Sequence, residues 1–126
     1  MKALIVEDNA AFREMTRNML TARFPFMSVS DASDGMEALG EVANSCPDLI
    51  LMDIRLPGKN GLELTREIKT LHPDVAVIIL TTYDFPEYRE AAEKYGADCF
   101  LVKGTTRSKE ILSCIDSIVA AKRKMH

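Results

Sequence analysis

Residues 49–53, LILMD, carry the pattern that decides the fold, because four apolar residues in a row end on an aspartate. Similar runs end on polar residues at three other places: ALIVED at 3–8, VIILTT at 77–82 and CFLVK at 99–103. Short runs of branched apolar residues, separated by helical patterns, are typical of buried parallel strands. Chemistry in an open parallel sheet lies at the carboxyl ends of the strands. We therefore expect acids, a lysine and a hydroxyl to converge on one edge of the sheet.

The residues that end these runs are of a kind that binds a hard cation and a phosphoryl group. They are Glu7, Asp8, Asp53, Thr81 and Lys103. Carboxylates at close range repel one another unless a cation joins them. Magnesium suits such a place because it binds one or two carboxylates together with a phosphate and keeps several waters. The set indicates a magnesium-dependent phosphoryl-acceptor site.

The composition of the chain is that of one ordinary globular domain. Its 126 residues are 47% hydrophobic and 28% charged, which predicts a single domain over residues 1–126 without an output domain. The net charge of −3 gives no reason to expect nucleic-acid binding by this domain. No signal peptide, lipidation motif or long apolar stretch occurs, so we expect no membrane association and a cytoplasmic location.

The cysteines favour a packing role over metal binding. Cys46, Cys99 and Cys114 are an odd number without metal-ligand spacing, which argues against zinc and against a disulfide. Cys99 falls in a predicted strand and Cys114 on a predicted helix, so both are interpreted as small buried hydrophobes.

Strand and helix patterns alternate five times along the chain. The predicted strands are 2–6, 26–31, 48–52, 75–80 and 98–102. The predicted helices are 9–22, 34 to about 44, a segment between 61 and 73, 84–96, and a last one from about 106. The second strand is more polar than the others, which indicates an edge. Repeated βα units predict right-handed crossovers with helices on both faces of the sheet.

Apolar spacing and capping residues set the predicted helix faces and ends. Asp34 with Glu37, and Asp84 with Glu87, form capping boxes. Asn9 competes with Asp8 to cap the first helix. The inward faces are predicted to carry Phe12, Met15 and Met19 on the first helix, Leu64, Ile68 and Leu71 on the third, and Ile111, Leu112, Ile115, Ile118 and Val119 on the last.

Taken together, these motifs resemble the receiver domain of two-component response regulators from end to end. The resemblance rests on Glu7-Asp8, on the spacing Asp53-x-x-Leu-Pro-x-x-x-Gly61, and on Thr81 and Lys103, in this order. It implies a flavodoxin-like α/β fold, a doubly wound (βα)5 parallel sheet of strand order 2-1-3-4-5. A receiver domain is a signalling domain that takes part in its own phosphotransfer and self-dephosphorylation rather than an enzyme with a separate substrate.

The resemblance also implies a cation site. Mg2+ (or Mn2+) would be held by Asp8, Asp53 and the backbone carbonyl of Arg55, with Glu7 acting through water. Asp53 would be the phosphoacceptor, and the phosphodonor would be the phosphohistidine of a sensor histidine kinase or a phosphotransfer protein.

By the same resemblance, Lys103 and Thr81 would each hold a phosphoryl oxygen. Thr81 would then move inward and open space for Phe100. This movement would shift the surface formed by the helix 84–96, the strand 98–102 and the last helix, and so control an output partner or domain. A homodimer through this surface is a further expectation. Tyr88 and Tyr95 are the aromatic side chains to test there, with ordinary half-buried packing as the alternative.

Several residues depart from the common family pattern or vary within it. Gly104 follows the lysine, where the family commonly has a cis proline. A residue other than proline at this position is familiar in receivers joined to LuxR/NarL-type DNA-binding domains. By this resemblance, DNA would be bound only through such an output domain. Arg55, Thr82 and Tyr83 are predicted to cover the phosphoryl group, with Arg55 pairing either with it or with Glu7. The cationic end, residues 122–124, is interpreted as a helix terminus, with a linker as the alternative.

Three other interpretations compete with a phosphorylated receiver. A degenerate receiver would bind a partner without phosphorylation, but the acid, threonine and lysine set is complete. An aspartate-nucleophile phosphatase would show Asp-x-Asp, whereas this chain has Asp53-Ile54-Arg55. A flavodoxin would need a hydroxyl- and glycine-rich phosphate loop after the first strand, where Glu7-Asp8-Asn9 would repel a phosphate in the absence of a metal. No nucleotide-binding glycine motif is present.

Overall fold

The computed structural model describes residues 1–124 and shows five strands alternating with five helices. The strands are β1 (Lys2–Val6), β2 (Ser28–Ala32), β3 (Leu49–Met52), β4 (Ala76–Thr81) and β5 (Cys99–Val102). The helices are α1 (Ala10–Arg23), α2 (Gly35–Ser45), α3 (Gly61–Leu71), α4 (Pro86–Lys94) and α5 (Ser108–Lys124). None of these helices is long and apolar enough to cross a membrane.

The strands form one parallel sheet of order β2-β1-β3-β4-β5, as the sequence predicted. β1 pairs with both β2 and β3, and the register sets Val6 opposite Met52. The order of the strands reverses between β1 and β3, which are neighbours in the sheet. Ligands of open α/β sheets bind at such a switch point.

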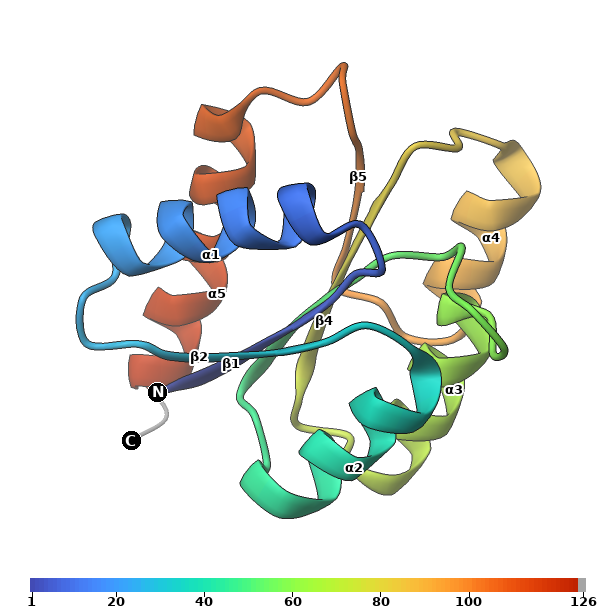
Figure 1. Ribbon diagram of the computed structural model, residues 1–126, viewed down its shortest axis with the longest axis horizontal. Coiled ribbons are helices and arrows are strands. Elements are labelled where there is room, and N and C mark those ends of the chain that lie inside the picture. The colour runs from blue at the N-terminus through green and yellow to red at the C-terminus, as the bar shows by residue number, and fades with distance from the viewer. Residues whose placement is uncertain (125–126) are drawn as a thin grey trace.

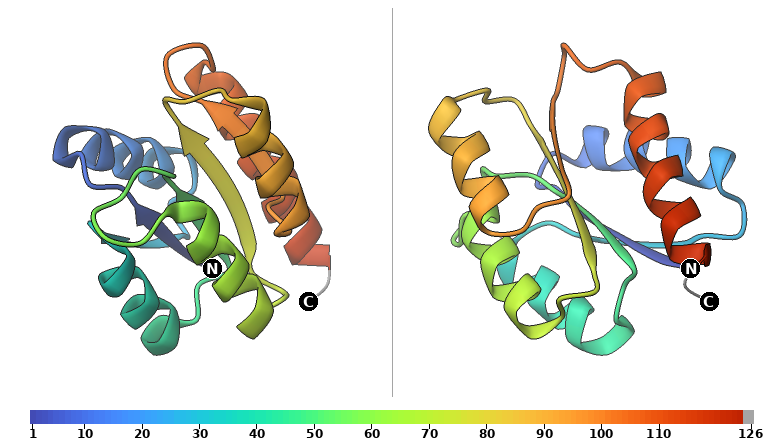
Figure 2. Two further views of the ribbon diagram at one scale, coloured as in Figure 1. Left: turned by 90° about the vertical axis from the view of Figure 1, so that its right-hand side faces the viewer. Right: turned by 180° about the vertical axis from the view of Figure 1, so that it is seen from behind.

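Helices cover both faces of the sheet. α1 and α5 lie on one face, and α2, α3 and α4 lie on the other (Figures 1 and 2). Each face has its own apolar core: Leu20 and Ile115 belong to the first, and Val42 and Ile68 to the second. The three central strands are buried on both sides, which explains their continuous apolar sequences.

Two residues predicted on inward helix faces are exposed. Met15 on α1 is 58% exposed and Leu71 at the end of α3 is 66% exposed. On α1 the buried positions are Thr16 and Leu20, because the face that meets the sheet is rotated by one residue from the predicted stripe. Leu71 is the last residue of its helix and extends past the edge of the core.

The boundary predictions were wrong by one to two residues at several elements. β2 begins at Ser28 because residues 24–27 form a turn, closed by a hydrogen bond from the Met27 N–H to the Phe24 carbonyl. β4 runs one residue later than predicted and ends at Thr81 itself. α5 begins at Ser108 because the Thr106 hydroxyl accepts the Val102 N–H and is used in the turn after β5.

Of the helix caps, those of α1 and α2 follow the prediction and that of α4 does not. Asn9 caps α1, and Asp34 accepts the Glu37 N–H at the start of α2. The Glu37 carboxylate bonds to the N–H and hydroxyl of Ser33. At α4 the cap position is Phe85 without a side-chain bond. Asp84 pairs instead with the Arg89 guanidinium at 2.5 Å, so the predicted capping box is wrong.

Cys99 and Cys114 are half-buried in the core under α5, and Cys46 is exposed. Burial raises the pKa of the Cys114 thiol to about 12, with a contribution from the neighbouring Cys99. The Cys114 thiol is therefore protonated at neutral pH, and both cysteines pack in the core as small side chains, as predicted.

Candidate functional site

Backbone hydrogen bonds extend the sheet past its strand ends and fix the residues that follow. The Glu7 N–H bonds to the Ala32 carbonyl, and the Asp53 N–H to the Val6 carbonyl, each at 3.0 Å. The Lys103 N–H bonds to the Thr81 carbonyl at 2.8 Å. The side chains after β1, β3 and β5 are therefore held at the same edge of the sheet.

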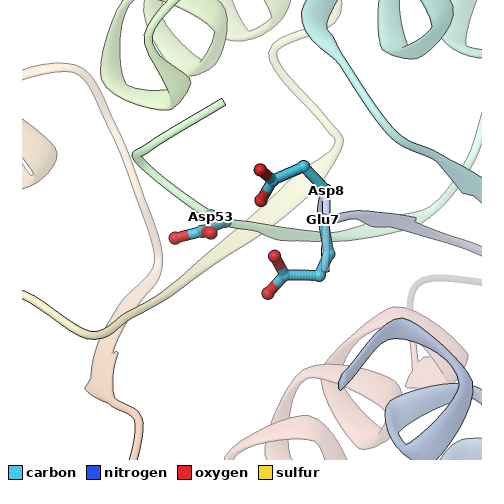
Figure 3. A group of neighbouring side chains, drawn as sticks. All are labelled: Glu7, Asp8 and Asp53. Carbon is cyan, nitrogen blue, oxygen red and sulfur yellow. The ribbon is translucent and has the colours of Figure 1, made fainter. Parts of the chain in front are cut away.

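Glu7, Asp8 and Asp53 form an acidic cluster at this edge. One carboxylate oxygen of each lies within 4.8 Å of the others, and Figure 3 shows the three carboxylates turned toward a common space. Glu7 is 3% exposed and Asp53 8% exposed, whereas Asp8 is exposed. The sequence prediction that these three acids meet is confirmed.

The Lys103 ammonium lies among the acids. It is ion-paired with Glu7, and its Nζ atom is 3.4 Å from Oδ2 of Asp53. Only 14% of the lysine side chain is exposed, so solvent screens these contacts weakly. The ring of Phe12, on the first turn of α1, faces the same ammonium with its centroid 4.2 Å from Nζ.

The environment raises the pKa of the Glu7 carboxyl above its ordinary value. Burial is the main cause, because it disfavours the charged form. The hydrogen bond from Lys103 and the N–H of Asn9 oppose the rise, and the charge of Asp53 adds to it. A cation bound at this cluster would therefore stabilise the ionised carboxylates against burial and mutual repulsion.

Asp53 is held by the loop that follows it. Its Oδ1 accepts the N–H of Ile54 at 2.8 Å, which leaves Oδ2 facing the lysine. The loop folds back so that the Gly61 N–H donates to the Ile54 carbonyl at 2.8 Å. A Cβ on Gly61 would lie 1.9 Å from the carbonyl oxygen of Asp53, so no side chain fits there. The glycine of the motif thus allows α3 to begin against the acid, a steric role that the spacing alone did not reveal.

Thr81 is fully buried, and its hydroxyl accepts the Tyr83 N–H at 3.3 Å. Phe100 lies on the neighbouring strand β5, paired in register with Ile79, and is half-buried. The Arg89 guanidinium of α4 lies 4.7 Å from the centroid of its ring. Thr81 therefore lies at the edge where the acids meet, while Phe100 contacts α4.

Arg55 and Tyr83 meet each other above the site. The Arg55 guanidinium lies 4.3 Å from the centroid of the Tyr83 ring, and Tyr83 stacks on Phe85. Glu7, one of the two partners predicted for Arg55, is paired with Lys103 instead. Thr82 is exposed beside them.

Tyr88 on α4 and Tyr95, which follows the last residue of α4, are both half-buried. Tyr88 packs edge-on against Phe85, and Tyr95 lies under the guanidinium of Arg66 on α3. Their positions fit the packing interpretation that the sequence left open.

The backbone conformation at Gly104 explains why no proline follows the lysine. No cis peptide bond occurs in residues 1–124, so the Lys103–Gly104 bond is trans. Gly104 has φ 85°, a left-handed conformation that glycine adopts readily and that the proline ring forbids.

Besides the Lys103–Glu7 ion pair, sequence reasoning missed two further contacts of Glu7 and one of Lys103. The Asn9 N–H bonds to the Glu7 carboxylate at 3.1 Å, and Arg13 bonds to the Glu7 carbonyl at 2.8 Å. Phe12 was assigned only to the apolar face of its helix. The sequence did hold a clue to these contacts: Asn9, Phe12 and Arg13 all lie in or next to the first helical turn after the acids, and that turn begins beside the site.

The fold and this edge define a flavodoxin-like domain with an acidic cluster and a lysine at the switch point between β1 and β3. Residues 3–116 match the response regulator receiver domain family, and the chain belongs to this family. It is therefore a receiver domain of two-component signalling.

Similar proteins agree with this assignment. The transcriptional regulatory protein DegU of Brevibacillus brevis is 37% identical over 103 residues, covering 82% of this chain and 44% of that protein. This chain thus spans less than half the length of that relative. A CheY-like receiver domain protein of Methanospirillum hungatei superposes with a TM-score of 0.90 at 28% identity, covering 99% and 98% of the two chains. A LuxR-family DNA-binding response regulator of Staphylococcus aureus superposes with 0.86 at 26% identity, covering 93% and 97%.

Proposed function

We propose that this domain is a phosphorylation-dependent switch whose phosphoacceptor is Asp53. The observation that carries the proposal is the position of its carboxylate, which has one oxygen tied to the backbone of Ile54 and the other facing Lys103. The donor is the phosphohistidine of a sensor histidine kinase or phosphotransfer protein. A carboxylate oxygen forms a bond to phosphorus, the phosphorus–nitrogen bond breaks, and the departing imidazole takes up a proton.

The donor set fits a divalent cation such as Mg2+ or Mn2+. Three carboxylates lie within 4.8 Å of one another, and hard oxygen ligands of this kind are what magnesium prefers. Asp8, Asp53 and the backbone carbonyl of Arg55 would hold the ion, with Glu7 acting through water. When bound, the cation neutralises negative charge on the acids and on the phosphoryl oxygens.

Lys103 and Thr81 are proposed to bind the transferred group. The lysine is a single positive charge on a flexible stem, and its ammonium reaches from Glu7 to a phosphoryl oxygen with a small movement. The Thr81 hydroxyl accepts from Tyr83, so its own proton remains to donate to another oxygen. Phosphoryl transfer needs mainly such positioning and neutralisation of charge.

Loss of the phosphoryl group requires attack by water on phosphorus. Arg55, Thr82 and Tyr83 would flank the path by which water reaches the phosphorus, a role supported by the contact that holds Arg55 and Tyr83 together. We infer that self-dephosphorylation is slow because these side chains exclude water.

The output is proposed to be a population shift on the surface formed by α4, β5 and α5. A hydrogen bond to the phosphoryl group draws Thr81 inward, and Phe100 follows into the space. Phe100 carries no hydroxyl, so it transmits the change through packing with Arg89 and its neighbours. The surface would control an output partner or domain in the cytoplasm, with homodimers as one arrangement and DNA contacted only through an attached output domain.

Intact-protein mass spectrometry tests the proposal directly. Wild type, Asp53→Ala and Asp74→Ala are incubated with magnesium and a small-molecule phosphodonor. Asp74 is an exposed aspartate before β4, at the other edge of the sheet, and serves as the control. One added phosphoryl group in wild type and Asp74→Ala, but not in Asp53→Ala, supports the proposal.

Two other outcomes would contradict parts of it. An unmodified wild type that also fails to bind magnesium in a titration would favour the alternative, a receiver that binds partners without phosphorylation. An unmodified wild type that does bind magnesium would restrict the reaction to its cognate phosphohistidine donor, which purified kinase would then have to modify.

A further inference from the structure

The Lys103 ammonium has three walls, of which one is uncharged. Glu7 and Asp53 form the two acidic walls, with the ion pair to Glu7 the closer contact. The third wall is the face of the Phe12 ring, whose centroid is 4.2 Å from Nζ. This distance is well within the range of about 6 Å in which a ring attracts a cation.

The local structure fixes the Phe12 ring relative to the acids. Phe12 lies on the first turn of α1, and its N–H donates to the side chain of the cap residue Asn9 at 2.9 Å. Its carbonyl accepts the Thr16 hydroxyl at 2.8 Å. The side chain packs at the edge of the core between α1 and α5. The ring therefore moves with the turn that begins immediately after Glu7 and Asp8.

An aromatic wall has a property that the acidic walls lack. The face of the ring attracts the ammonium electrostatically but forms no conventional hydrogen bond and takes no charge from it. A phosphoryl oxygen arriving at Asp53 can therefore take the lysine N–H groups without displacing the ring. Glu7, by contrast, competes with that oxygen for the same ammonium.

We propose that Phe12 is a positioning residue for phosphoryl transfer, whose ring holds the Lys103 ammonium beside Asp53 while the N–H groups change partner. This inference rests on the proposed phosphorylation of Asp53. Without the ring the lysine stem would sample more conformations, and the reacting complex would form less often.

The competing explanation is that Phe12 only fills the core. Its neighbour Met19, on the same groove between α1 and the start of α5, provides the comparison. Met19 lies seven residues farther along α1, about two helical turns from Phe12. A change there alters apolar packing without removing a ring from the lysine.

The test measures the rate of phosphoryl uptake at Asp53 by intact mass, with saturating magnesium and a small-molecule donor. We expect Phe12→Leu to slow uptake by about two- to thirtyfold, the range that a cation–π contact supplies. Phe12→Tyr, which keeps a ring, should restore most of the rate, and Met19→Leu should match wild type. In a Lys103→Ala background, Phe12→Leu should have no further effect on the residual rate.

Three results would overturn the proposal: Phe12→Leu matching wild type, Phe12→Tyr being as slow as Phe12→Leu, or equal slowing with and without Lys103. Urea unfolding of each variant separates loss of fold from loss of rate.

Proton NMR of the Lys103 side chain separates this inference from the proposed function. The ring should shift the lysine methylene resonances next to Nζ, and Phe12→Leu should abolish the shift. If wild type shows the shift but takes up no phosphoryl group from the small-molecule donor or from purified kinase, the proposed function fails although the contact exists. If wild type is phosphorylated and the shift is absent, the positioning role fails alone.

Discussion

The Lys103 ammonium is ion-paired with the buried carboxylate of Glu7, across the ends of two strands that are not neighbours in the sheet. The same Nζ atom lies 3.4 Å from Oδ2 of Asp53, so among residues 1–124 Asp8 is the member of the acidic cluster without an ion-pair partner. We expect such a site to attract a divalent ion, whose binding would free the lysine to change partner. The resting geometry therefore connects cation binding to the position of Lys103.

In metal-free solution we expect Glu7→Gln to gain stability relative to wild type as the pH rises. Burial raises the folded-state pKa of Glu7 above its ordinary value of 4.5, so the folded protein keeps this proton to higher pH than the unfolded chain. Such a group contributes its full share of stability below the ordinary pKa, and the share is lost as the pH rises through the folded pKa. Glutamine cannot lose a proton and avoids this loss.

Urea unfolding on both sides of this interval measures the difference. The exposed Glu14 lies on α1, and Glu14→Gln is the matched control. Free energies of unfolding for Glu7→Gln and wild type that stay parallel over the pH range would contradict the prediction.

Magnesium should stabilise the folded domain through the acidic cluster. A ligand that binds only the folded state at 100 times its dissociation constant adds about 2.7 kcal/mol to the free energy of unfolding. We expect Asp8→Asn and Asp53→Asn to lose most of this increase, and Asp74→Asn to retain it. Urea unfolding in magnesium and in chelator makes the comparison, and an unchanged increase in Asp8→Asn would remove that residue from the ligand set.

Replacing Gly61 and replacing Gly40 by alanine should have opposite effects on stability. A Cβ at Gly61 would lie 1.9 Å from the Asp53 carbonyl, so Gly61→Ala should lower stability by about 1–3 kcal/mol and disturb the acid. A Cβ at Gly40, on the exposed side of α2, meets nothing within 4 Å. Gly40→Ala should raise stability by up to about 1 kcal/mol, because alanine favours a helix. Thermal and urea unfolding of both variants test the contrast, and equal effects would refute the steric argument.

The ends of the strands could be predicted from sequence because each buried run stops at a polar residue. Strand order and the meeting of Glu7, Asp8 and Asp53 followed from that pattern and from the family resemblance. The pattern was weaker at helix faces: Met15 and Leu71 fit an apolar stripe, yet they are exposed. A stripe shows which residues share a side of a helix, but not how far the helix is rotated or where the core ends.

Contacts between elements could not be predicted from the sequence in the same way. Lys103 pairs with Glu7 across 96 residues of sequence, and the Phe12 ring meets that lysine only after α1 and β5 pack. The Asp84 capping box failed because Arg89 offers the carboxylate a charged partner in place of a backbone N–H. Local rules do not rank such competing partners, because the choice depends on the final packing.

Arg55 and Tyr83 should act together in protecting the phosphorylated state. Their contact at 4.3 Å predicts that Arg55→Ala and Tyr83→Ala each speed dephosphorylation by about two- to tenfold, a range consistent with the loss of one cation–π contact. The acceleration in the double variant should be smaller than the product of the two single accelerations, since either change alone breaks the contact. Decay of the phosphorylated mass after donor removal gives the rates. Arg66→Ala, a change at the arginine over Tyr95, is the control and should leave the rate unchanged.

Phe100→Ala should leave phosphorylation at Asp53 intact while weakening its effect on α4. The ring lies under the Arg89 guanidinium, and Arg89 is held by Asp84 at the start of the same helix. Without the ring, a movement of Thr81 has no packed neighbour on β5 through which to reach α4. Hydrogen exchange of residues 84–96 before and after phosphorylation measures this coupling. The change seen in wild type should shrink in Phe100→Ala and persist in Phe100→Leu, which keeps an apolar side chain. A full response in Phe100→Ala would show that α4 senses the phosphoryl group by another route, of which the stacked Arg55, Tyr83 and Phe85 side chains are the structural candidate.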